Sequence, residues 1–273
     1  MIPIEEPMQL FYNNRVVNWH EHVWMNAQGE LAIPQMEDLI LSAEKTGMDT
    51  LLCSLPLTQY RYCSPEQVRK ANDLVFQAMQ MHPDKIMGMC FIDPGNIREA
   101  LHEIDRCVND YGMVGVKMYH QYFINDPVQY PLIEKCIDLN IPILMHAGKA
   151  TRPPVEQPHL SGGTHFADVA QRYPEANFIM AHIGGGGDWY WQLKAIAPYK
   201  NIVTDMSGSV HDRDIMEQTV AYLGADRVLF GTDGSTGMCV GKILACDIPV
   251  EDKKTILEGT AYLKFLERGK KTC

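Results

Sequence analysis

The segment IPILMHAG, residues 141–148, decides the fold that the sequence predicts. It opens with five apolar residues in a row and ends in a histidine followed by two small residues. A strand that is apolar at every position suits a parallel sheet buried on both faces, because both of its sides then face protein. The segment therefore predicts a buried parallel strand with His146 at its carboxyl end.

Seven further segments share this character, each a short apolar or β-branched run that ends in small or polar residues. They are RVVNWHEH (15–22), DTLLCSL (49–55), KIMGMCFID (85–93), MVGVKMY (113–119), NFIMAHIGG (177–185), NIVTDMSG (201–208) and RVLFGTDG (227–234). Helical patterns with recognisable stops are expected over 34–47, 64–83, 96–112, 128–140, 164–174, 189–199, 211–224 and 250–269. This alternation predicts one α/β domain over residues 1–273, a single (β/α)8 TIM barrel, with a doubly wound open sheet as the alternative.

Composition excludes several classes of protein. The formal net charge of −10 over 273 residues argues against nucleic acid as a partner, because binding to a phosphate backbone needs a basic face. No apolar run reaches the length of a signal peptide or a membrane span, so we expect a cytoplasmic protein that does not bind membranes. The eight cysteines form no C-x-x-C pair and are expected to be free, buried thiols. The sequence leaves a homo-oligomer open.

The expected strands end in residues that carry chemistry. His20 and His22 are two positions apart, so their side chains share one face of the first strand. Four other strands end near Lys117, His146, His182 and Asp233. Active sites of TIM barrels collect at the carboxyl ends of the strands, so we expect these side chains to converge.

Four of these residues form a ligand set for one divalent metal. A borderline cation takes neutral imidazoles and a carboxylate, and a catalytic site leaves one position open for water or substrate. The set comprises His20, His22, His146 and Asp233. We expect zinc, with manganese, nickel and iron as alternatives.

The motifs resemble those of the amidohydrolase superfamily. They are HEH (20–22), GVK (115–117), PILMHAG (142–148), FIMAHIGGG (178–186), TDMSG (204–208) and FGTD (230–233). More narrowly, the chain is similar to the amidohydrolase-related (amidohydrolase 2) branch, which includes enzymes like aminocarboxymuconate semialdehyde decarboxylase. The sequence departs from the pattern of this branch at Asn18, where aspartate is frequent, at Gly234-Ser235, where an aromatic residue and proline are common, and at Thr260, where Gly-Asn-Ala is frequent.

The resemblance also implies roles for individual residues. It assigns one metal, usually zinc, to the four residues named above, and activation of the metal-bound water to His182. Asp233 can be a ligand and also accept a proton during attack by that water. Lys117 is open to three interpretations: a carboxylated lysine that bridges a second metal, as in binuclear members of the superfamily, a binder of a substrate anion, or a cation paired with Asp233.

Cations in the loops near the expected site indicate the substrate class. Arg61 follows the second strand, and Lys149 and Arg152 follow His146. Together with Lys117 they favour a small carboxylate-bearing molecule, because guanidinium groups bind carboxylates bidentately. We expect hydrolysis of a C–O or C–N bond, as in a lactone or cyclic amide, with non-oxidative decarboxylation of an unsaturated or aromatic acid as the alternative. A third hypothesis is a metal-binding barrel without catalysis.

Overall fold

The structure is a computed structural model in which residues 5–58, 62–148 and 157–269 are described. Eight strands form one parallel sheet in which each strand pairs with the next along the chain. Their bounds are β1 (Val17–His22), β2 (Thr50–Ser54), β3 (Ile86–Phe91), β4 (Gly115–Met118), β5 (Pro142–Met145), β6 (Asn177–Met180), β7 (Ile202–Asp205) and β8 (Val228–Leu229). All eight strands were expected from the sequence.

The sheet closes into a barrel between β1 and the segment that follows β8. Trp19 N donates to Phe230 O at 2.8 Å, and the carbonyl of His20 accepts from Thr232 N at 3.2 Å and from Asp233 N at 2.8 Å. The last strand is only two residues long. The first and last segments of the barrel are therefore joined by bonds from the residues that follow β8, not from the strand itself. The fold is a (β/α)8 TIM barrel, as predicted, and the open-sheet alternative is wrong.

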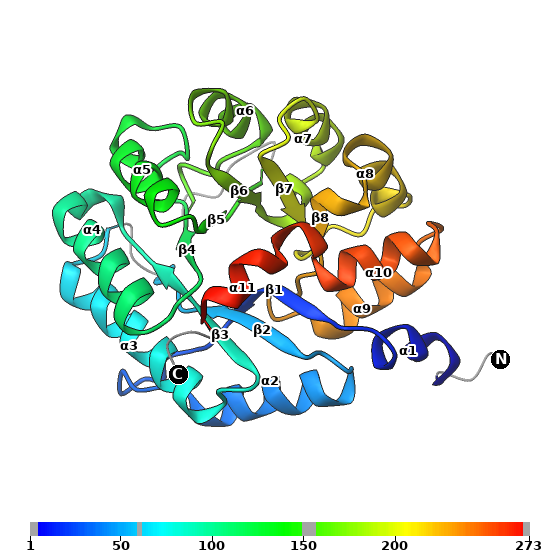
Figure 1. Ribbon diagram of the computed structural model, residues 1–273, viewed down its shortest axis with the longest axis horizontal. Coiled ribbons are helices and arrows are strands. Elements are labelled where there is room, and N and C mark those ends of the chain that lie inside the picture. The colour runs from blue at the N-terminus through cyan, green and yellow to red at the C-terminus, as the bar shows by residue number, and fades with distance from the viewer. Residues whose placement is uncertain (1–4, 59–61, 149–156, 270–273) are drawn as a thin grey trace.

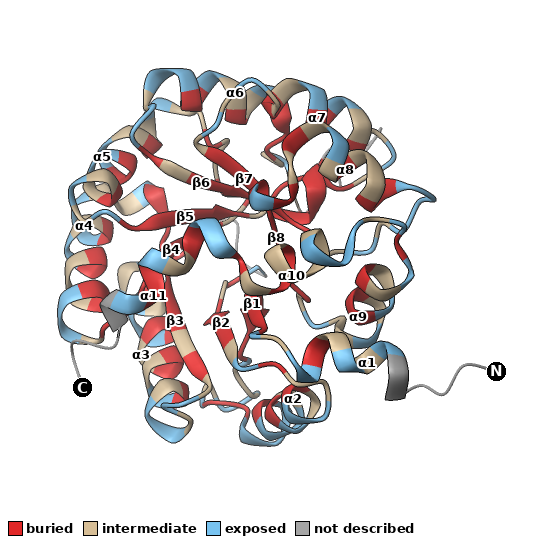
Figure 2. Ribbon diagram, turned by 45° about the vertical axis from the view of Figure 1, so that its right-hand side comes forward, coloured by how far each residue is buried: buried red, intermediate tan, exposed pale blue. Residues whose placement is uncertain are grey.

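Helices surround the barrel on all sides (Figure 1). They are α1 (Glu5–Tyr12), α2 (Ile33–Lys45), α3 (Pro65–Met81), α4 (Ile97–Asp105), α5 (Tyr130–Asp138), α6 (Gly163–Arg172), α7 (Trp189–Ile196), α8 (Ile215–Leu223), α9 (Thr236–Ala245), α10 (Val250–Glu258) and α11 (Leu263–Gly269). A π-helical turn over Arg106–Asp110 extends α4, and short 3-10 turns cover Pro94–Asn96, Pro127–Gln129, Ala181–Gly184, Ala225–Arg227 and Thr260–Tyr262. Buried residues lie along the strands and the inner faces of the helices (Figure 2).

Three helical segments differ from the expectation, and the first is α1, which the sequence did not predict. The sequence did not predict α9, because Gly237 and Gly241 weaken its helical pattern. The helix expected over 250–269 is interrupted at Gly259, whose φ of 66° ends α10 in a left-handed cap. A Cβ at this position would lie 2.2 Å from the Trp19 ring nitrogen, so glycine is also required for close packing.

Tyr262, in the turn after Gly259, packs edge-on against Trp19 and donates from its hydroxyl to the Phe178 carbonyl at 3.2 Å. The turn between α10 and α11 thereby packs against β1 and the start of β6. Within the described residues, no helix combines the length and the apolar character that crossing a bilayer requires.

Candidate metal centre

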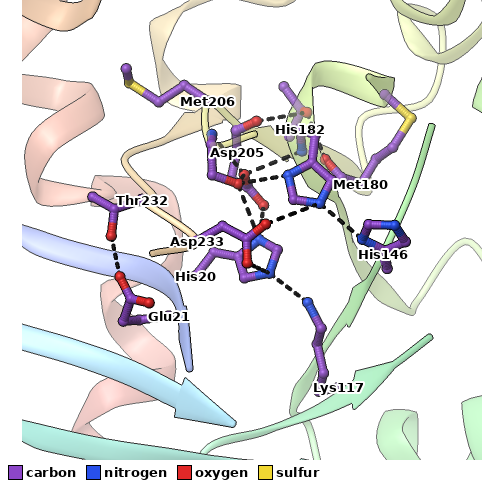
Figure 3. A network of polar contacts seen from close by, with 12 residues as sticks. His20, Glu21, Lys117, His146, Met180, His182, Asp205, Met206, Thr232 and Asp233 are labelled. Atoms are coloured by element: carbon purple, nitrogen blue, oxygen red, sulfur yellow. Dashed lines mark hydrogen bonds and ion pairs between the residues drawn. The ribbon is translucent and has the colours of Figure 1, made fainter. Parts of the chain in front are cut away.

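The expected site residues that the structure describes meet at the carboxyl end of the barrel. Figure 3 shows five of them together: His20, Lys117, His146, His182 and Asp233. His20 and His22 are in β1 and Lys117 is in β4. The remaining side chains lie within four residues of the ends of their strands: His146 after β5, His182 after β6 and Asp233 after β8. The structure therefore brings together all of the predicted site residues that it describes.

Three of these side chains form a compact group of donor atoms. Asp233 Oδ1 is 3.0 Å from His22 Nε2 and 3.7 Å from His20 Nε2. The two histidines are almost fully buried, whereas the Asp233 side chain is 27% exposed. The group is thus closed on the side of β1 and open at Asp233, which is the side from which a small molecule can approach.

Hydrogen bonds fix the tautomers of His20 and His22, so that in each ring the nitrogen with the lone pair faces Asp233. His20 Nδ1 is 3.0 Å from Asp205 Oδ2, and His22 Nδ1 is 3.0 Å from the Ser54 hydroxyl and 3.3 Å from its carbonyl. Because a carboxylate and a carbonyl only accept, both Nδ1 atoms carry the hydrogen. Burial, and secondarily the charge of Lys117, lowers the pKa of His20 to about 4, so the ring is neutral at pH 7.

With the hydrogen on Nδ1 of both rings, the donor atoms around Asp233 suit a metal ion. His22 Nε2 and Asp233 Oδ1 are both acceptors, yet they face each other across 3.0 Å. Such a contact is stable only with a proton or a cation between the two atoms. Two neutral imidazoles and a carboxylate are also a donor set that divalent transition metals accept. The group formed by His20, His22 and Asp233 can therefore hold a divalent metal.

His146, the fourth predicted ligand, contacts His182. The two rings are joined by a hydrogen bond of 3.0 Å between His146 Nδ1 and His182 Nε2, and His182 Nε2 is 3.7 Å from Asp233 Oδ2. Tyr119 stacks on His146, with ring centroids 4.2 Å apart. Burial lowers the pKa of His182 and lowers that of His146 well below its usual range.

Asp205, at the end of β7, holds this arrangement together. One carboxylate oxygen accepts from His20, and the other accepts from the backbone of His182 and from the backbone and hydroxyl of Ser207. Burial works to raise the pKa of Asp205, but the charge and hydrogen bond of His20 outweigh it and hold the pKa below its usual range. Sequence reasoning assigned no role to this residue. Its signal was the motif TDMSG at the end of a predicted strand.

Ser207 sets the direction of a hydrogen-bond chain. Its hydroxyl donates to Asp205, so its oxygen accepts from His182 Nδ1 at 2.8 Å. His182 Nε2 then accepts from His146 Nδ1, while His146 Nε2 faces the side-chain oxygen of Gln157 at 3.4 Å. A proton added to this pair can be shared between the two rings.

Two of the site residues have strained backbones. His182 has φ 64° and Asp233 has φ 46°, and Ile183, which is β-branched, has φ 53°. Residues other than glycine rarely adopt this left-handed region, and strain of this kind collects at functional sites. Backbone hydrogen bonds of His182 to Asp205 and of Asp233 to His20 stabilise the two turns.

Lys117 lies against the metal-facing side of His20. Its Nζ is 2.5 Å from His20 Nε2, and the side chain is fully buried. Burial lowers the pKa of Lys117 to about 8, against the opposing charges of Asp233 and Asp205. The other three predicted substrate-binding cations, Arg61, Lys149 and Arg152, lie outside the described residues.

A sequence model of the amidohydrolase family matches residues 59–264, about three quarters of the chain. The chain is 24% identical over 242 residues to γ-resorcylate decarboxylase of Rhizobium radiobacter, an alignment that covers 68% of this chain and 72% of the relative. It is also 23% identical over 143 residues to 2-keto-4-carboxy-3-hexenedioate hydratase of a Sphingobium species. That alignment covers 44% of this chain and only 41% of the hydratase.

The same fold occurs in the crystal structure of a dihydroxybenzoic acid decarboxylase from a Polaromonas species, which contains manganese and the inhibitor 2-nitroresorcinol. The TM-score is 0.71 at 17% identity, and the alignment covers 93% of this chain and 97% of the decarboxylase. The matched segment includes five of the six motifs on which the resemblance was based. The chain therefore belongs to the amidohydrolase family, within the amidohydrolase-related branch that also contains decarboxylases.

Proposed function

We propose that the protein is a metal-dependent carboxy-lyase that releases carbon dioxide from a small aromatic or unsaturated carboxylic acid. The sequence ranked hydrolysis first, but the relatives favour the alternative. A γ-resorcylate decarboxylase aligns with 68% of the chain, and the other two relatives named above are a decarboxylase and a hydratase. Their activities concern carboxylated substrates, as the loop cations also suggested.

One observation carries the proposal: the His182–His146 pair lies beside the group formed by His20, His22 and Asp233. Decarboxylation breaks a C–C bond and forms a C–H bond at the same carbon, so a proton must be delivered there. The pair is joined at 3.0 Å, and His182 Nε2 is 3.7 Å from Asp233 Oδ2. A proton taken up by this pair would lie next to the place where a carboxylate would bind.

His20, His22 and Asp233 would hold the metal, with His146 as the predicted fourth ligand. When bound, a divalent cation supplies positive charge that attracts carboxylate or hydroxyl oxygens of the substrate. Zinc or manganese suits these donors. Asp205 orients His20 and His182, and Lys117 adds a second positive charge deep in the site.

The test is a substrate screen on protein loaded with Mn²⁺ or Zn²⁺. Hydroxylated benzoates and unsaturated acids are compared with lactones and cyclic amides, while carbon dioxide and proton release are followed. In D2O, we expect one mole of carbon dioxide per mole of product and one deuterium at the carbon that lost it. A chelator should abolish the reaction and added metal should restore it.

Other results would contradict the proposal in distinct ways. Acid formed from a lactone or amide without carbon dioxide would identify a hydrolase. Addition of water to an unsaturated acid would identify a hydratase. Tight metal binding without turnover of either substrate set would favour the non-catalytic barrel.

A further inference from the structure

Glu21, between the two histidines of β1, is a buried carboxylate with four hydrogen-bond donors. Its Oε1 accepts from His22 N and Gly234 N, each at 2.9 Å. Its Oε2 accepts from the Thr232 hydroxyl and, at 3.4 Å, from Asn18 Nδ2. The side chain is 1% exposed. A carboxylate removed from water needs such donors. Two of the four, Thr232 Oγ1 and Gly234 N, belong to the loop after β8 and tie it to β1.

Asn18 gives this cluster a fixed direction. Its Oδ1 accepts from His20 N and from Thr232 N, each at 3.2 Å, so its Nδ2 must face the cluster. Nδ2 donates to Thr232 Oγ1 at 2.6 Å. The Thr232 hydroxyl is therefore an acceptor for Asn18 and a donor to Glu21, and the chain runs one way from amide to carboxylate (Figure 3 shows the Thr232–Glu21 contact).

The cluster holds both neighbours of Asp233. Thr232 precedes Asp233 and Gly234 follows it, and both bind Glu21. The backbone of Asp233 between them has φ 46°, a conformation that a residue other than glycine keeps only when its surroundings enforce it. The Glu21 carboxylate also binds the backbone of His22, whose ring faces Asp233 Oδ1.

We propose that Glu21, acting with Thr232 and Asn18, is the positioning residue that sets the Asp233 carboxylate against His22 for metal binding. This inference rests on the proposed function, in which these two residues bind a divalent cation. Glu21 does not itself contact the cation in this assignment. Its effect passes through the backbone of the loop after β8, so it alters metal affinity rather than the number of sites.

Asn18 is matched to Glu21. An aspartate at position 18 would put a second carboxylate about where Nδ2 now lies, 3.4 Å from Glu21 Oε2. It could not donate to Thr232 Oγ1, and the two negative charges would repel each other in a buried setting. The frequent aspartate of the branch is thus incompatible with this cluster.

The experiment measures Mn²⁺ affinity by titration of metal-free protein, using electron paramagnetic resonance to count free Mn²⁺. Thr232→Val keeps the shape of the side chain but removes the hydroxyl, and Thr232→Ser restores it. We expect Thr232→Val to weaken Mn²⁺ binding 10- to 100-fold, as is typical for loss of a group that orients a ligand, and Thr232→Ser to bind within threefold of wild type. Asn18→Asp should weaken binding to a similar extent as Thr232→Val.

Thr219→Val is the matched control. Thr219 is a fully buried threonine in α8 whose hydroxyl donates to the Ile215 carbonyl at 2.6 Å. Its replacement should lower the melting temperature of the metal-free protein but leave Mn²⁺ affinity unchanged. Without metal, we expect Thr232→Val and Thr219→Val to melt at the same temperature. Added metal should stabilise Thr219→Val but not Thr232→Val, and this difference separates a role in positioning Asp233 from a role in general stability.

Each outcome decides the inference. If wild type binds Mn²⁺ and Thr232→Val binds it equally well, the positioning role is wrong while the metal site stands. If Thr232→Val does not fold, the variant Glu21→Gln is used instead. The amide nitrogen of the new glutamine cannot accept from the Thr232 hydroxyl. A Mn²⁺ affinity equal to that of wild type would then overturn the inference. If wild type itself binds no Mn²⁺ or Zn²⁺, the proposed function fails first, and the inference with it.

Discussion

Lys117 Nζ approaches His20 Nε2 to 2.5 Å and donates to the lone pair that a metal would use. His20 has no other lone pair to offer, because its Nδ1 hydrogen is bound to Asp205. The ammonium group and a divalent cation therefore compete for one atom. This relationship makes Lys117 a determinant of metal affinity, whichever substrate the enzyme takes.

Lys117→Met should bind Mn²⁺ about tenfold more tightly than wild type, because it removes a positive charge next to the cation, a change of about 1.4 kcal/mol. Titration of metal-free protein measures this. Lys85→Met is the control, since Lys85 Nζ donates to the Met48 carbonyl at 2.6 Å, just before β3 at the opposite end of the barrel. Loss of metal from Lys117→Met would instead show that the lysine is carboxylated and bridges metal ions.

His182→Asn should keep its metal but lose turnover by roughly 100- to 10,000-fold, as expected for loss of a group that transfers a proton. His146→Ala, by contrast, should lose both metal and turnover if the predicted fourth ligand is right. Elemental analysis and steady-state kinetics distinguish the two. Metal lost from His182→Asn would make His182 a ligand, and His102→Asn, an exposed position on α4, serves as the control.

Asp205→Asn should weaken Mn²⁺ binding or turnover 10- to 100-fold, although Asp205 is not among the predicted ligands. An amide at this position no longer favours the His20 tautomer with hydrogen on Nδ1, and it provides a weaker acceptor for Ser207. Asp49→Asn is the matched control, because Asp49 accepts from Val16 N at 2.7 Å at the start of β1. Wild-type affinity and turnover in Asp205→Asn would refute an orienting role.

The seven described cysteines should resist alkylation in the native protein. All are free and buried, and burial together with the charge of Asp93 raises the pKa of Cys63 to about 12. At pH 8 only about one Cys63 thiol in 10,000 is then ionised. Because only the thiolate is alkylated, the rate of reaction rises only as the pH approaches that pKa. Cys273→Ser protein should react with a thiol reagent only after denaturation. Rapid reaction of the native form would contradict the burial.

The fold and the convergence of the site residues could be predicted because both follow from one pattern. Apolar strands that end in histidine or aspartate place those residues at one end of a barrel, whatever the loops do. His20, His22, His146, His182 and Asp233 were recognisable for this reason. Their individual roles as ligand or proton carrier remain predictions.

The supporting residues could not be predicted because their function depends on partners far away in the sequence. Asp205 is one carboxylate among many until His20 and His182 are placed beside it. Glu21 lies between two histidines of one strand, so the sequence predicts that its side chain faces away from them. That prediction does not reveal that Glu21 binds the loop after β8. The pairing of Asn18 with Thr232 joins residues 214 positions apart.

The closure between β1 and the loop after β8 has a consequence for biosynthesis. The His20 carbonyl binds Thr232 N and Asp233 N, so the first and last parts of the donor group meet only when nearly all of the barrel has left the ribosome. Contacts between such distant segments are slow to form, and domains are completed in the order of synthesis. Metal capture should therefore be a late event in the life of each molecule, and nascent chains released before residue 233 should be unable to retain the ion.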